Sequence, residues 1–101
     1  MLKKLTLAAL LLSAASPSAF ASSDDAWAEF ATKVEEACLG ATSEILTDAQ
    51  ATVDPFGSEN YGLAVVTGKA DATTTKSIIC VFDKKTEAVE IGGELDLPAA
   101  S

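Results

Sequence analysis

Histidine and arginine are absent from this chain of 101 residues, and cysteine occurs only twice. Without histidine there is no imidazole general base, so neither a Ser-His-Asp nor a Cys-His catalytic arrangement is available. A zinc site needs three or four ligands, which two cysteines without histidine do not supply. Without arginine, the chain lacks the side chain best suited to phosphates and guanine edges. These absences argue against a hydrolase, a zinc protein and a nucleic-acid-binding protein.

Positive charge is scarce, because 7 lysines face 15 aspartates and glutamates and the formal net charge is −8. An acidic surface repels nucleic acids and anionic membranes and attracts cationic proteins. No acidic loop has the spacing of an EF-hand, and the glycines form no phosphate-binding motif. We therefore predict a protein that is not an enzyme and that needs neither a metal nor another cofactor.

The chain has no long hydrophobic run. A short one lies near its start. Two lysines precede the apolar stretch 5–15, and the small residues Ala19 and Ala21 follow it, an order typical of a secretory signal. A membrane-spanning helix needs about 20 apolar residues, so this stretch is too short for a permanent anchor. The sequence predicts a cleavable signal at 1–21 and a periplasmic or secreted bacterial protein. Removal of the signal takes two lysines with it and leaves a formal charge of −10.

The two cysteines, Cys38 and Cys80, allow a single intramolecular disulfide once the chain reaches an oxidising compartment. Their separation lacks the Cys-x-x-Cys spacing of redox-active pairs. A domain of this size has a small core, so a cross-link adds much to its stability. We expect one disulfide with a structural role.

The hydrophobic pattern predicts one helix followed by several strands. Between residues 22 and 43, apolar residues recur three and four positions apart on one side of a helix. This stripe contains Trp27, Phe30, Ala31, Val34, Cys38 and Ala41. Period-two patterns then predict a weak strand at 49–53 and stronger strands at 61–67, 77–82 and 88–91. The threonine-rich stretch 70–75 either extends a strand or forms a hairpin loop.

Short connections between these strands predict an antiparallel meander, because parallel neighbours need a long crossover. The predicted fold is a two-layer α+β domain, in which the N-terminal helix packs on three or four antiparallel strands and one disulfide joins the layers (an α-β-β-β meander). Gly92-Gly93 is expected to end the last strand. A single domain is therefore predicted at 22–93, with a flexible tail at 94–101.

The strand that contains Cys80 is apolar on both sides. If Cys80 faces the helix, then Ile78 and Phe82 face it too, and Ile79 and Val81 point the other way. One helix covers one face of a sheet, and adjacent exposed apolar residues often mark an interface. The pattern therefore predicts a possible partner surface on the open face of the sheet.

Val66, or a residue next to it, is expected beside Ile79 and Val81 on this surface. Three alternatives could cover this surface: the segment 95–100, a second copy in a homodimer, or a different protein partner. Gly92-Gly93 and Pro98 make the C-terminal segment a poor cover, which favours self-association over the tail.

The layout resembles that of small exported bacterial proteins that pair a helix cysteine with a strand cysteine. The residues that carry the resemblance are Cys38 in the helix, the strand Ser77–Phe82, and Val89-Glu90-Ile91 after a tight turn. The resemblance covers most of the chain after the signal and implies no particular activity. Two functions remain open: a non-enzymatic binding or protein-interaction module, or an inhibitor of a cationic secreted enzyme such as lysozyme, with residues 54–61 as an accessible loop.

Signal cleavage is expected after Ala21, because Ala19 and Ala21 form the small-x-small pair between the apolar stretch and the acidic residues that follow. Intact-mass measurement of the exported protein should therefore give the mass of residues 22–101. A product that keeps residues 1–21 would contradict the prediction.

Overall fold

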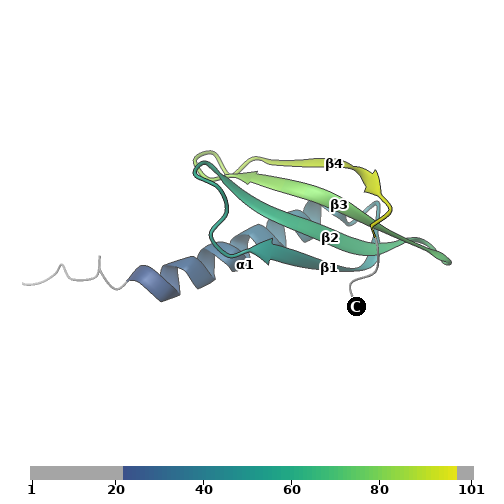
Figure 1. Ribbon diagram of the computed structural model, residues 1–101, viewed down its shortest axis with the longest axis horizontal. Helices are drawn as coiled ribbons and strands as arrows, with labels where there is room; N and C mark the ends of the chain where they lie inside the picture. Colours follow the sequence, from purple (N-terminus) through teal and green to yellow (C-terminus); the bar gives the residue numbers. More distant parts are fainter. Residues whose placement is uncertain (1–21, 98–101) are drawn as a thin grey trace, which may run out of the picture.

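One helix and four strands make up residues 22–97, the part of the chain that the computed structural model describes (Figure 1). The elements are helix α1 (Ser22–Thr42) and strands β1 (Thr47–Asp54), β2 (Tyr61–Asp71), β3 (Thr74–Asp83) and β4 (Val89–Leu95). Each strand pairs antiparallel with the next, in the order β1-β2-β3-β4. The predicted α+β meander is confirmed, with four strands. The predicted signal at 1–21 and residues 98–101 of the predicted tail lie outside the described residues.

The threonine-rich stretch between β2 and β3 extends both strands. β2 runs to Asp71 and β3 begins at Thr74, so Ala72 and Thr73 alone connect them. The carboxylate of Asp71 accepts a hydrogen bond from the backbone amide of Thr73 at 2.9 Å, which is how aspartate commonly stabilises a tight turn. The resulting hairpin projects beyond the ends of β1 and β4 (Figure 1).

Strand β4 continues through Gly92 and Gly93, where the sequence pattern predicted its end. Opposite these two glycines, β3 contributes one residue, Ile79, so β4 contains a β-bulge. Glycine is common at such positions because the bulged backbone bends. The predicted tail at 94–101 starts too early, because Leu95 still pairs with β3.

Helix α1 lies across one face of the sheet, and its N-terminal turns extend beyond the strands (Figure 1). A spacing of four places Val34, Cys38 and Thr42 on its buried side, each 0% exposed. The Thr42 hydroxyl donates to the Cys38 carbonyl oxygen at 2.9 Å, so this buried polar group is satisfied. The predicted stripe is wrong at its ends, where Ala41 and Trp27 are exposed. Trp27 lies in the overhanging turns.

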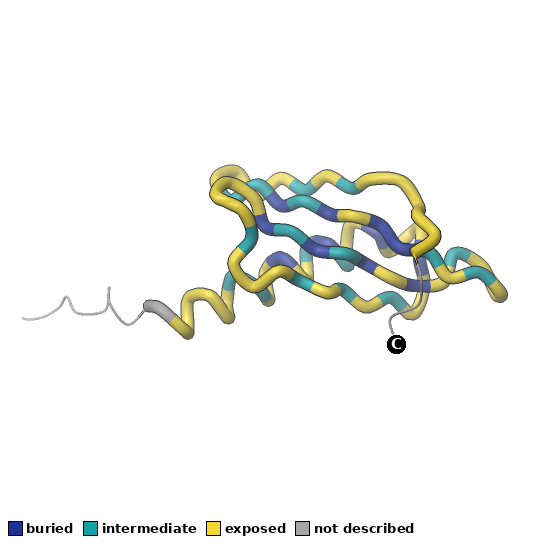
Figure 2. The backbone as a smooth tube through the Cα atoms, in the orientation of Figure 1, coloured by how far each residue is buried: buried dark blue, intermediate teal, exposed yellow. Residues whose placement is uncertain are grey.

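The core lies between α1 and the inner face of the sheet (Figure 2). Its buried apolar residues are Val34, Cys38, Leu46, Ala64, Val66, Ile78, Cys80 and Phe82. Small residues on β2 let the helix approach the strand backbone closely. A Cβ atom placed on Gly62 would lie 2.6 Å from Val34 Cγ2, so any larger residue there would push the helix away.

A disulfide joins Cys38 of α1 to Cys80 of β3, with the two Cα atoms 6.0 Å apart. Both residues are fully buried, and β3 is one of the two central strands. The predicted disulfide is therefore confirmed. It ties the C-terminal part of the helix to a central strand of the sheet and closes a loop with a sequence separation of 42.

Loss of this cross-link should strongly destabilise the fold. Cys80→Ala should lower the free energy of unfolding by about 2–5 kcal/mol, because the unfolded chain is no longer constrained and a core contact is lost. Urea denaturation of the exported protein measures the change. Reduction of the wild-type protein is the control, because it breaks the bond but keeps both sulfur atoms in the core. Two titratable thiols in protein purified without reductant would contradict the assignment.

Candidate functional site

We call the face of the sheet opposite α1 the outer face, and its centre is apolar. Leu63 and Val65 of β2 lie directly opposite Val81 and Ile79 of β3, respectively. We call these four residues the outer patch. Ile79 is 49% exposed, and the other three are half-buried. Among the described residues, the single helix packs on the other face, so no second layer covers the patch.

The structure places Ile79 and Val81 on the outer face because β3 alternates and Cys80 faces the helix. The sequence predicted Val66 or a residue next to it beside them, and Val66 itself is not on this face. It is 0% exposed and belongs to the core beneath the helix. Its neighbour Val65 points to the outer face instead, since adjacent residues of a strand face opposite sides.

The sequence analysis did not identify Leu63 as an outer-patch residue, and it included Val65 only as a neighbour of Val66. The available signal was the alternation along β2 of the small residues Gly62 and Ala64 with these larger ones. A helix packs most closely over the small side, so the larger side chains point away from it. With both faces of the strand apolar, hydrophobicity alone did not distinguish them.

Neutral polar residues continue the outer face on two sides of the patch. Thr52 of β1 lies opposite Val65. The hydroxyl oxygens of Thr67 and Ser77 lie 2.8 Å apart and hydrogen-bond to each other across β2 and β3. One of the two O–H groups is thereby paired, which lowers the cost of covering this pair with a partner.

The two ends of the outer face differ in charge. Asp54, Asp83 and Glu90 lie opposite Leu63, Tyr61 and Val81 in the strand pairing, which places three carboxylates at the end formed by the turns. Lys69 of β2 and Asp48 of β1 lie toward the other end, beside a shared hollow. The first end has three carboxylates on the outer face, with Lys84 and Lys85 in the adjoining turn, whereas one lysine and one aspartate offset each other at the second end.

A shallow groove of about 380 Å³ runs beside the patch between β1 and β3. It is lined by Thr52, Val53, Asp54, Leu63, Ala64, Val65 and Ile79. A second shallow groove, of about 750 Å³, continues toward the β2–β3 hairpin and reaches Leu97. Leu97 is 51% exposed, so the segment after β4 borders the outer face without closing it.

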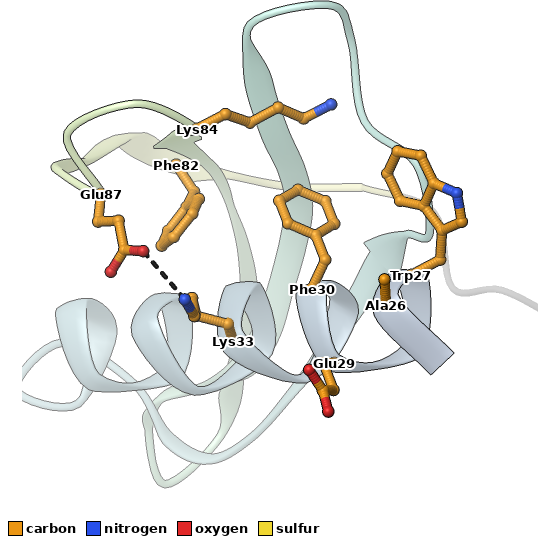
Figure 3. Close-up of a pocket in the computed structure, with 8 residues that line it drawn as sticks. All are labelled: Ala26, Trp27, Glu29, Phe30, Lys33, Phe82, Lys84 and Glu87. Carbon is orange, nitrogen blue, oxygen red and sulfur yellow. Dashed lines mark hydrogen bonds and ion pairs between the residues drawn. The ribbon is translucent and has the colours of Figure 1, made fainter. Parts of the chain in front are cut away.

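Four aromatic rings gather at the end of the molecule where α1 overhangs the sheet, and we call this cluster the aromatic end. Figure 3 shows three of them, Trp27, Phe30 and Phe82. Trp27 packs edge-to-face against Phe56 and Phe30, with ring centroids 5.1 and 5.8 Å apart. Phe30 packs in the same way against Phe82 at 6.1 Å. The sequence analysis did not find this cluster, because it assigned Trp27 to the core.

Lys84 occupies the centre of the aromatic end. Its ammonium group lies 5.1 Å from the ring centre of Phe30 and 5.5 Å from that of Trp27. It also donates hydrogen bonds to the carbonyl oxygens of Phe56 at 3.0 Å and Ser58 at 2.7 Å. Lys84 thus fills the place where an external cation would sit and joins the helix to the loop after β1. We interpret the aromatic end as a structural clamp.

An ion pair closes one side of the cleft of about 370 Å³ at the aromatic end, where the Lys33 ammonium lies 3.0 Å from the Glu87 carboxylate (Figure 3). Both side chains are more than half exposed, so the pair contributes little to stability. Its geometry links α1 to the turn before β4.

Two aspartates hold the turns that border this end. The carboxylate of Asp83 accepts hydrogen bonds from the backbone amides of Thr86 at 3.0 Å and Lys85 at 2.8 Å. Asp54 accepts two in the same way from the amides of Gly57 and Phe56. These bonds favour the ionised form and lower the pKa of both carboxyl groups. Both groups are therefore suited to holding turns rather than to transferring protons near neutral pH.

Within residues 22–97, no group of three or more acidic or cysteine side chains lies close enough together to hold a metal ion. The helix in this range is not long and apolar enough to cross a bilayer. No protein-family model, curated protein or solved structure matches the chain. The described residues offer two surfaces for contact with another molecule, the outer face and the aromatic end. Lys84 already fills the aromatic end, so the outer face is the candidate site.

The clamp role of Lys84 can be tested against its neighbour. Lys84→Met should lower the free energy of unfolding by about 1 kcal/mol, because it removes the cation from the two rings and both bonds to the loop. Lys85→Met removes the same charge from an exposed side chain and should change stability by less than about 0.5 kcal/mol. Urea denaturation followed by circular dichroism measures both variants. Equal effects would show that Lys84 is an ordinary surface lysine.

Proposed function

We propose that this chain is a non-enzymatic protein-interaction module that is exported by its N-terminal signal and binds a protein through the outer face. The observation that carries the proposal is the outer patch, in which the directly opposed pairs Leu63–Val81 and Val65–Ile79 make a continuous apolar centre. Contiguous exposed apolar surface on a small domain is typical of an interface. The polar border and the charged ends match the usual anatomy of a binding surface.

An extracellular or periplasmic location is compatible with two features of the described residues. One is the buried disulfide, since such bonds persist in oxidising compartments. The other is that residues 22–97 contain no helix able to span a membrane. The proposal of export rests on the signal pattern at 1–21.

Inhibition of a cationic secreted enzyme such as lysozyme is the second candidate function. The loop after β1 supports it, because Asp54 and Lys84 fix the loop by hydrogen bonds while Phe56 remains 56% exposed. A rigid loop loses little entropy on binding, which is an advantage for an inhibitor. Salt distinguishes the two functions, because binding to a basic enzyme should weaken as ionic strength rises.

Replacing Ile79 and Val81 of the patch should strongly weaken binding without unfolding the protein. The double variant Ile79→Thr/Val81→Thr keeps strand propensity and should reduce retention of partner molecules on the immobilised protein by about 10-fold or more. Its free energy of unfolding should change by less than about 1 kcal/mol, because the substituted residues lie outside the core.

Ile45→Thr is the matched control, because Ile45 is exposed in the connection between α1 and β1. It should bind like the wild type. The retained molecules would be quantified from a periplasmic extract and, separately, from the purified protein itself. Retention that is the same in all three proteins, or absent in all of them, would refute the outer face as a binding surface.

A further inference from the structure

We propose that the occupant of the outer face is a second copy of this chain, packed face to face about a two-fold axis. The inference rests on the proposed function, because it names the partner of the same surface. In such a dimer the same patch serves both subunits, so each contact occurs twice. The surface must therefore complement itself, and two features of the outer face meet this requirement.

The first feature is a protruding side chain beside a groove that can receive it. Ile79 is 49% exposed and forms one wall of the groove of about 380 Å³. Thr52, Leu63 and Val65 line the same groove. Rotation about a two-fold axis near this point places Ile79 of each copy in the groove of the other. Both insertions bury apolar surface on both sides.

The second feature is the size of the face. β2 and β3 have 11 and 10 residues, which at about 3.3 Å per residue gives a length of roughly 35 Å. Four strands about 4.8 Å apart make the face roughly 19 Å wide. The resulting area, on the order of 600 Å² before corrugation, approaches the about 800 Å² that each partner contributes to a standard interface. The outer face can thus support a dimer of moderate affinity.

The symmetry that this insertion needs also decides which ends meet. Ile79 of β3 reaches the groove over β2 of the partner when the two-fold axis runs along the strands, and such an axis brings equal ends together. The carboxylates of Asp54, Asp83 and Glu90 then lie near the same groups of the partner, and their repulsion opposes the apolar contact.

The overall charge predicts how this dimer responds to salt. Two copies of an acidic chain repel each other, and salt screens the repulsion. The apolar contact in the centre is not weakened by salt. Association should therefore tighten as the salt concentration rises, which is opposite to the behaviour of a complex with a basic partner.

Sedimentation of the exported protein, purified without reductant, tests the inference. A monomer–dimer equilibrium should appear between about 5 and 500 µM, and its dissociation constant should fall several-fold between about 20 and 300 mM sodium chloride. Thr52→Lys should raise that constant by about 10-fold or more, because it places a charge in the groove that receives Ile79. The added lysine reduces the net repulsion, so electrostatics between whole molecules cannot explain such a loss.

Thr32→Lys on the exposed side of α1 is the matched control. It makes the same substitution and charge change away from the outer face and should leave the constant unchanged or slightly lower. Circular dichroism of both variants would verify that they are folded.

A monomer at every concentration, a dimer that Thr52→Lys does not weaken, or a dimer that salt dissociates would each overturn the inference. A monomeric protein that still retains another protein through Ile79 and Val81 would overturn the dimer alone, whereas no patch-dependent binding at all would overturn the proposed function too.

Discussion

The bond between Cys38 and Cys80 is the constraint on which the rest of the structure depends. A single helix on a small sheet has few contacts with which to define its position, and this bond makes one of them covalent within the buried core. Once Cys80 faces the helix, Ile78 and Phe82 must join the core, and Ile79 and Val81 must leave it. One covalent link therefore determines both what the core contains and which apolar residues the molecule presents to its surroundings.

Much of this arrangement could be predicted from the sequence. The helical spacing, the strand alternation and the cysteine pair all indicate the same buried faces. The spacing of Val34 and Cys38 defined the buried side of the helix, and the alternation around Cys80 defined both sides of β3. The predictions that failed concern β2 and β4, which contain no cysteine bonded to the helix. In β2 no residue is tied to the helix, so the sequence predicted the strand but did not decide whether Val66 or its neighbour faces outward. Gly92-Gly93 ended the predicted strand because a bulge depends on pairing with β3, which the local sequence does not encode.

The candidate site was less predictable than the fold, because it combines residues from several elements. Leu63 and Val65 join the patch through the register of a hairpin, and Thr52 joins the groove through a third strand. The aromatic end depends in the same way on the loop that brings Phe56 to Trp27. Strand register and loop geometry depend on how all the strands pair. The hydrophobic periodicity of the sequence shows only which side of one helix or strand is buried, so it does not show which residues of different elements meet.

The position of Trp27 has a spectroscopic consequence. It is the single tryptophan of the chain, and its ring lies among Phe30, Phe56 and Lys84 at the aromatic end, whereas the outer patch lies across the sheet from the helix. Its fluorescence therefore reports on the docking of the first helical turns against the loop after β1. A partner seated on the outer patch would leave that emission unchanged, so the opening of the helix end can be followed optically while the opposite face is occupied.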